Sequence, residues 1–243
     1  MKKLIVLLGL VAGFSQTAAA ANFSALGALT PTQFQLLSED FGAALSYKSL
    51  QPADPLGITG FDVSLEATST DISKSGAALK AATGGALDIT SIIIPKLHVS
   101  KGLPFGIDVS ASLSSVPSTD IKLTGAELRY AIMKGGIALP AVAIRAAMSS
   151  MTGVPELEFN TKSLDLSISK GFLMFTPYAG VGQVWVNSTP NLTVNPNSLT
   201  AQSFTLTKTF IGANLNFGLM NFALEGDKTG DASSASFKFG FRW

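Results

Sequence analysis

Residues Ser236-Phe237-Lys238-Phe239-Gly240-Phe241-Arg242-Trp243 end the chain, and their pattern decides the fold class. Aromatic residues occupy every second position and small or polar residues the others, which is typical of a β-strand with two different faces. On the free edge of a soluble sheet, such an aromatic row would invite pairing with another chain. In a closed membrane barrel the last strand pairs with the first, and the aromatic row faces lipid. The stretch therefore predicts the closing strand of a transmembrane β-barrel.

A C-terminal strand that alternates in this way and ends on Phe or Trp resembles the closing strand of bacterial outer-membrane β-barrel proteins. The resemblance covers about ten residues and points to the superfamily, not to one member of it. It implies a location in the outer membrane of a Gram-negative cell, contact with outer-membrane lipids, and assembly through periplasmic chaperones and the barrel assembly machinery. It also implies that this machinery reads the lipid-facing aromatic residues of the strand: Phe237, Phe239, Phe241 and Trp243.

The composition agrees with a barrel better than with a soluble domain. Of the 243 residues, 47% are hydrophobic and only 14% are charged, whereas soluble domains carry about 25% charged residues. After the N-terminal region, the apolar residues are spread over short alternating segments, and no run approaches the roughly twenty residues of a membrane-spanning helix. There is no cysteine, so neither a disulfide framework nor a lipid-modified N-terminal cysteine is expected.

The first 21 residues have the features of a secretory signal peptide. Lys2 and Lys3 precede an apolar run from Leu4 to Phe14, and small residues follow up to a cleavage site after Ala20 or Ala21. The apolar run of about eleven residues is too short to span a membrane. Removal of the two lysines changes the formal charge from +1 to −1. A nucleic-acid partner is therefore not expected, because phosphate binding needs a concentrated basic face.

Residues 22–56 are expected to form an N-terminal periplasmic or lumenal segment that precedes a barrel over residues 57–243. Thr30 and Pro31 provide an N-cap and a first helical residue, and Phe34, Leu37 and Phe41 follow at helical spacing. A short helix is thus predicted from Pro31 to Asp40, leading into an extended segment.

From residue 57 onward, alternating segments and turn residues predict about ten antiparallel strands in up-and-down order. Twelve strands are the alternative if residues 41–49 also belong to the barrel. Short turns are expected at 101–102, 134–136, 170–171 and 217–218, and longer polar loops at 69–85, 114–119, 151–160, 187–201 and 226–233. Short and long connections that alternate in this way are typical of outer-membrane barrels, whose short turns lie on the periplasmic side.

Strand parity places a set of charged residues on the face opposite the apolar residues, and hence toward the lumen. A lipid-facing Arg or Lys at the membrane midplane would cost about 2–4 kcal/mol, which supports the same placement. The predicted lumen residues are Asp62, Glu66, Lys96, His98, Asp108, Glu127, Arg129, Arg145, Asp165, Glu225, Lys238 and Arg242. Either they fill a narrow barrel with ion pairs or they line a polar pathway. The small number of strands favours the filled barrel.

The function predicted from the sequence is a non-enzymatic outer-membrane barrel that acts as a narrow channel or a structural barrel. A protein that binds an external surface through its long loops is the alternative. An outer-membrane lipid hydrolase is the less favoured alternative, because His98 and Ser100 share the His-x-Ser spacing of outer-membrane phospholipases. Such a pair also recurs by chance, so no catalytic residue is assigned. One histidine and no cysteine predict no metal site, and no cofactor is expected.

Overall fold

The computed structural model describes residues 23–116, 119–136, 138–192 and 197–243. The predicted signal peptide over residues 1–21 lies outside the described residues. Ten strands make up most of the described chain: β1 (Phe61–Asp71), β2 (Ser91–Gly102), β3 (Ile107–Ser115), β4 (Lys122–Met133), β5 (Ala141–Thr152), β6 (Leu157–Ser169), β7 (Phe175–Pro190), β8 (Gln202–Phe217), β9 (Met220–Thr229) and β10 (Ala232–Arg242).

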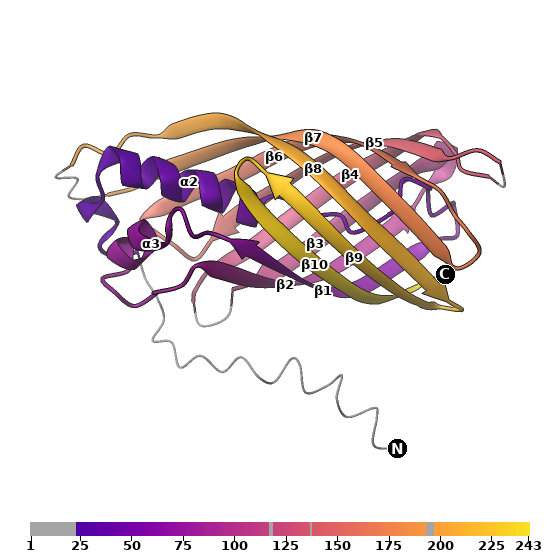
Figure 1. Ribbon diagram of the computed structural model, residues 1–243, viewed down its shortest axis with the longest axis horizontal. Helices are drawn as coiled ribbons and strands as arrows, with labels where there is room; N and C mark the ends of the chain where they lie inside the picture. The colour runs from indigo at the N-terminus through magenta and orange to yellow at the C-terminus, as the bar shows by residue number, and fades with distance from the viewer. Residues whose placement is uncertain (1–22, 117–118, 137, 193–196) are drawn as a thin grey trace, which may run out of the picture.

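The strands form one closed antiparallel barrel in which each strand pairs with its neighbours in sequence and β1 pairs with β10 (Figure 1). The predicted up-and-down barrel of about ten strands is therefore confirmed, and the twelve-stranded alternative is wrong. Asp62 lies opposite Arg242 and Val63 opposite Phe241 in the closing pair. The Phe61 amide donates to the Trp243 carbonyl at 2.7 Å, so the last residue of the chain completes the ring.

The two ends of the barrel carry different connections. At one end, short connections over 103–106, 134–140, 170–174 and 218–219 join the strands, and the C-terminus lies there too (Figure 1). At the other end lie the long connection over 72–90, which contains the helix α3 (Gly76–Ala82), and the connections over 116–121, 153–156 and 191–201. We call these the short-turn end and the helix end.

The predictions of long polar loops over 151–160 and 226–233 are wrong, because only four residues connect β5 to β6 and only two connect β9 to β10. Gly230 takes the left-handed conformation that this tight turn needs, with φ +59°. The inward-facing positions of β9 and β10 extend into this stretch, with buried side chains at Asp227, Thr229 and Ser234. Since the outward positions at this level carry few apolar residues, hydrophobic alternation could not reveal the strands.

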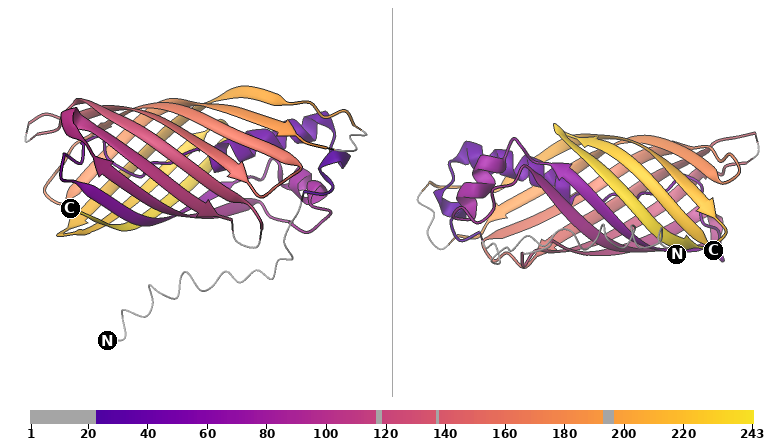
Figure 2. Two further views of the ribbon diagram at one scale, coloured as in Figure 1. Left: turned by 180° about the vertical axis from the view of Figure 1, so that it is seen from behind. Right: turned by 60° about the horizontal axis from the view of Figure 1, so that its bottom comes forward.

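The predicted N-terminal helix is confirmed as α2 (Pro31–Leu45), which runs five residues further than expected. Thr30 caps it: the Gln33 amide donates to the Thr30 hydroxyl, and the Gln33 side chain accepts from the Thr30 amide. A 3₁₀ turn, η1 (Leu26–Ala28), precedes the helix. Figures 1 and 2 show α2 and α3 together at the helix end, with α2 set against the barrel mouth.

These helices close the mouth with an apolar core. Phe23, Phe34 and Phe41 are buried among inward-facing apolar residues of the strand ends. The Phe41 ring lies edge-on to Phe23, at 5.9 Å between centroids, and to Phe159 of β6, at 6.2 Å. We call this unit, residues 23–45 with α3 and the strand ends around it, the cap. Burial of so many large side chains makes it the hydrophobic core of the molecule.

After α2 the chain passes through the barrel. Residues 46–56 carry neither helix nor strand. Residues 46–53 are buried, Asp54 is exposed, and β1 then begins at the short-turn end. Figure 1 shows this part of the chain inside the ring of strands. The described chain therefore starts at the helix end, runs through the lumen and joins the barrel wall at the opposite end. We call residues 46–56 the lumenal segment.

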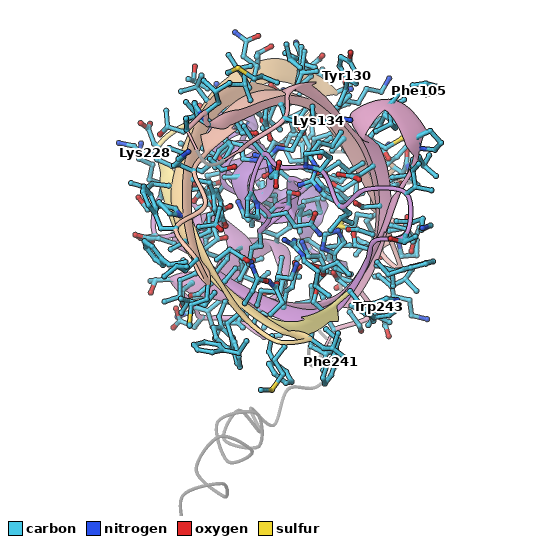
Figure 3. The ribbon with its side chains drawn as sticks, turned by 90° about the vertical axis from the view of Figure 1, so that its right-hand side faces the viewer. Phe105, Tyr130, Lys134, Lys228, Phe241 and Trp243 are labelled. Atoms are coloured by element: carbon cyan, nitrogen blue, oxygen red, sulfur yellow. The ribbon has the colours of Figure 1, made fainter. Side chains whose placement is uncertain are left out.

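The wall has an apolar outer face and a polar inner face. Phe237, Phe241 and Trp243 are 43%, 49% and 55% exposed on the outside, and Phe239 beside them is half-buried. Figure 3, a view from the short-turn end, shows Tyr130, Phe241 and Trp243 outside the ring. Among the described residues, no helix is long and apolar enough to cross a membrane.

The lumen as candidate functional site

The twelve charged residues assigned to the lumen by strand parity lie on the inward face of the wall. Ten of them are buried, and Lys96 and Arg242 are partly buried. The structure adds two charged residues that the sequence analysis missed, Lys208 of β8 and Asp227 of β9. Alternation along β8 would have placed Lys208 on the inner face, but the threonines beside it weaken the apolar pattern of that strand. Asp227 lies in residues 226–233, which the sequence predicted as a loop.

Most of the wall charges form short ion pairs across neighbouring strands. Asp62 Oδ1 lies 2.8 Å from Lys238 Nζ, and its Oδ2 lies 2.9 Å from Arg242 Nε. Arg129 donates through Nε and Nη2 to Asp108 Oδ2, at 3.0 and 2.6 Å. These pairs are placed by the strand register, in which Asp62 faces Arg242 and Asp108 faces Arg129. Buried charges that are paired in this way avoid most of the cost of leaving water.

Two further pairs complete the set. Glu66 Oε2 lies 2.7 Å from Lys96 Nζ on the neighbouring strand. Asp165 of β6 reaches across Gly182 of β7 to Lys208 of β8, with 3.1 Å between Oδ2 and Nζ. Arg145 stacks over the Phe210 ring, with 4.7 Å from its Cζ to the centroid. Glycine makes room for this ring, since a Cβ on Gly180 would lie 2.2 Å from Phe210. Gly180 on β7 therefore leaves the space that the Phe210 ring needs inside a ten-stranded barrel.

The lumenal segment is bonded to this wall through its side chains. Lys48 Nζ lies 2.9 Å from Asp227 Oδ1, and Ser49 donates to Glu127 Oε1 at 3.0 Å. The Tyr47 hydroxyl is 2.9 Å from a ring nitrogen of His98. The Tyr47 ring lies against Gly125 of β4, where a Cβ would come within 2.7 and 2.9 Å of two ring carbons. Gly125 thus provides a recess that a larger residue would fill.

The wall also bonds the backbone of the segment. Lys208 donates to the Tyr47 carbonyl at 3.1 Å, and Arg129 donates to the Pro52 carbonyl at 2.6 Å. Lys96 donates to the Lys48 carbonyl. In the other direction, the Ala53 amide donates to Ser169, at 3.0 Å, and the Leu56 amide to Asp108, at 3.1 Å. Wall side chains thereby satisfy buried backbone groups that no secondary structure satisfies.

The segment adds a basic side chain to the wall. The inward positions of the ten strands carry seven carboxyl groups and six Lys or Arg side chains: Asp62, Glu66, Asp108, Glu127, Asp165, Glu225 and Asp227 against Lys96, Arg129, Arg145, Lys208, Lys238 and Arg242. Lys48 pairs with Asp227. Without Lys48, Asp227 would lose this partner, and a buried carboxylate without a partner is costly.

His98 and Ser100 belong to a closed hydrogen-bond chain. Glu66 Oε1 lies 2.8 Å from His98 Nδ1, and His98 Nε2 lies 3.3 Å from the Ser100 hydroxyl. Carboxylate, imidazole and hydroxyl in this order also occur in serine hydrolases. Here, however, Tyr47 bonds the imidazole and Gln51 donates to Ser100 at 2.8 Å, and both His98 and Ser100 are 0% exposed. The arrangement holds the segment in place and presents no accessible nucleophile.

No group of three or more His, Cys, Asp or Glu residues in the described part of the chain is arranged to hold a metal ion. The described lumen instead consists mainly of ion pairs and hydroxyls, together with Arg145, which stacks on Phe210. Such an arrangement can bind polar groups by hydrogen bonds and ion pairs, and the lumenal segment occupies it.

No protein-family model matches the chain, and no curated protein matches it. Among solved structures, it is similar to the N-terminal β-barrel domain of Pseudomonas aeruginosa OprF, with 16% identity over 74% of this chain and 97% of that chain and a TM-score of 0.35. It is also similar to the KdgM porin in complex with disordered oligogalacturonate, at 7% identity, 74% and 98% coverage and a TM-score of 0.40. The outer membrane protein Omp33 of Acinetobacter baumannii matches at 7% identity, 77% and 100% coverage and a TM-score of 0.31.

The fold and the lumen define the class of this protein from its own geometry. It is a closed ten-stranded antiparallel barrel with an apolar outside, a charged inside, and a lumen occupied by its own N-terminal segment.

Proposed function

We propose that this protein is an integral outer-membrane barrel that its own N-terminal region keeps closed. The observation that carries the proposal is the division between the faces of the wall: lipid-compatible aromatic and aliphatic side chains lie outside, and fourteen charged or titratable side chains lie inside. A barrel has no unpaired strand edges, so it can cross a membrane with all backbone groups satisfied. The short-turn end would face the periplasm and the helix end the exterior.

Two barriers in series support a closed state rather than a constantly open channel. The cap fills the helix end with an apolar core, and the lumenal segment is bonded along the polar part of the lumen. The narrow channel expected from the sequence would conduct only after both the cap and the segment move. The long loops contribute to closure as well, because Asn197 donates to the carbonyls of Gly27, Ala28 and Leu29 in the cap. This contact favours a sealing role for that loop over binding of an external surface.

Cell fractionation and planar-bilayer recording test the proposal together. We expect the protein in the outer-membrane fraction, with a gel mobility that changes on boiling as the folded barrel opens. The purified protein should show no steady conductance in a bilayer. Recovery as a soluble periplasmic protein would contradict the membrane location, and a stable open pore in the unmodified protein would contradict the closed state.

A further inference from the structure

The lumenal segment contacts the barrel in the way that a bound peptide contacts a protein, through side chains of the wall and not through shared secondary structure. It has no helical or strand assignment, and none of its bonds to the barrel is part of a β-ladder. The wall strands use their backbone groups to pair with each other. The contacts to residues 46–56 therefore come from wall side chains that converge on an extended chain from several strands.

Part of this recognition does not depend on the sequence of the bound chain. The carbonyls of Tyr47, Lys48 and Pro52 accept from Lys208, Lys96 and Arg129, three cations on three different strands. Two amides donate to the wall as well. Any extended peptide offers the same carbonyls and amides, as in other modes of peptide recognition that rely on the main chain.

Two adjacent side chains add selectivity. Tyr47 fills the recess at Gly125 and bonds His98, and Lys48 pairs with Asp227, whose side chain is 0% exposed. The wall therefore selects an aromatic residue followed by a cation. Without Lys48, Asp227 has no cationic partner, which also favours a cation at this position of the bound chain.

We propose that the lumen is a binding site for extended peptides that carry an aromatic residue followed by a cation, and that residues 46–56 are its tethered ligand. This goes beyond the proposed function, because it predicts binding of a separate chain. It depends on the lumen contacts and not on the location of the protein in the cell. A tethered ligand has an effective concentration in the millimolar range for short linkers, so a free peptide competes poorly until the tether is cut and the resident contacts are weakened.

The experiment cuts one of the two attachments of the segment, the link to β1, in the complete chain; the link to α2 remains, so the resident contacts must also be weakened. A protease recognition sequence is inserted between Ile58 and Thr59, in an exposed stretch at the short-turn end, and the resident contacts are weakened by Tyr47→Ser with Lys48→Ser. The probe is a synthetic fluorescent peptide with the native sequence of residues 46–56, and its binding in detergent is followed by anisotropy. Gel mobility shows that the nicked barrel stays folded.

We expect saturable binding to the nicked variant, with a Kd at least tenfold lower than for the same variant before cleavage. A peptide with Ser at the positions of Tyr47 and Lys48 should bind at least tenfold more weakly. Gly125→Leu in the nicked variant should abolish binding of the native peptide, whereas Gly136→Ala should not, since a Cβ at Gly136 meets no atom within 4 Å. Absence of binding to a folded nicked barrel, or equal binding of both peptides, would overturn the proposal. Neither result would affect the fractionation test.

Discussion

Lys48 and Asp227 form an ion pair of 2.9 Å inside the barrel although 179 residues separate them in the chain. Their side chains are 3% and 0% exposed. Lys48 belongs to the segment that crosses the lumen, and Asp227 to a strand of the wall. This pair therefore ties the two parts of the molecule together.

Lys48→Met is expected to destabilise the folded barrel by about 3–5 kcal/mol, because it leaves Asp227 buried without a cation. Urea unfolding in lipid vesicles, followed by tryptophan fluorescence, measures the change. Lys122→Met is the matched control: Lys122 lies exposed on the outer face of β4, so its loss should change stability by no more than about 0.5 kcal/mol. Equal losses in both variants would show that the ion pair contributes nothing specific.

Gly125→Leu is expected to expel Tyr47 from its recess, because the new side chain would occupy the space of the Tyr47 ring. The lumenal segment should then become sensitive to protease, whereas the cap, which Gly125 does not contact, should keep the barrel closed to ions. Gly136→Ala serves as control at a glycine with open space around it. A Gly125→Leu protein as resistant to protease as the parent would contradict the assigned role of Gly125.

Deletion of Phe241 to Trp243 is expected to lower the amount of protein in the outer membrane before it affects any activity. The deletion removes the pairing of Val63 with Phe241, the backbone bonds between Phe61 and Trp243, and the Arg242 partner of Asp62. Immunoblots of fractionated cells give the readout. Trp243→Phe keeps a terminal aromatic residue and should restore near-normal levels; normal levels of the truncated protein would refute the prediction.

Asp40 in α2 gives the cap a dependence on pH. Burial raises the pKa of the Asp40 carboxyl above its ordinary value, and the hydrogen bond from the Ser75 amide, at 2.9 Å, offsets this only in part. A carboxyl whose pKa is higher in the folded than in the unfolded state contributes stability below its unfolded pKa. That contribution is lost as the pH rises through the folded pKa.

Asp40→Asn should therefore be more stable than the parent at about pH 7, and the difference should shrink toward about pH 3.5, near the ordinary pKa of Asp. Asn can still accept from the Ser75 amide. Urea unfolding of both proteins at the two pH values measures the difference. A difference that grows toward acid would mean that the carboxylate is stabilised in the cap, contrary to its burial.

The alternation of residues 236–243 was sufficient to predict the closing strand, since a period of two assigns every side chain to one face once one face is apolar. The same rule placed Asp62, Arg129 and Lys238 on the inner face before any partner was known. It failed over 226–233, where both faces are polar or small and the strands leave no hydrophobic signal.

The sequence by itself thus determined the barrel, the start of α2 after Thr30 and the charged character of the lumen, and it left ten and twelve strands open. These features depend on local periodicity and capping, which neighbouring residues specify. Only the tertiary structure decided that residues 46–56 pass through the lumen, because this segment has no period of its own. Its path is fixed by Gly125, Arg129 and Asp227, which the closure of the barrel brings around it from distant positions in the chain.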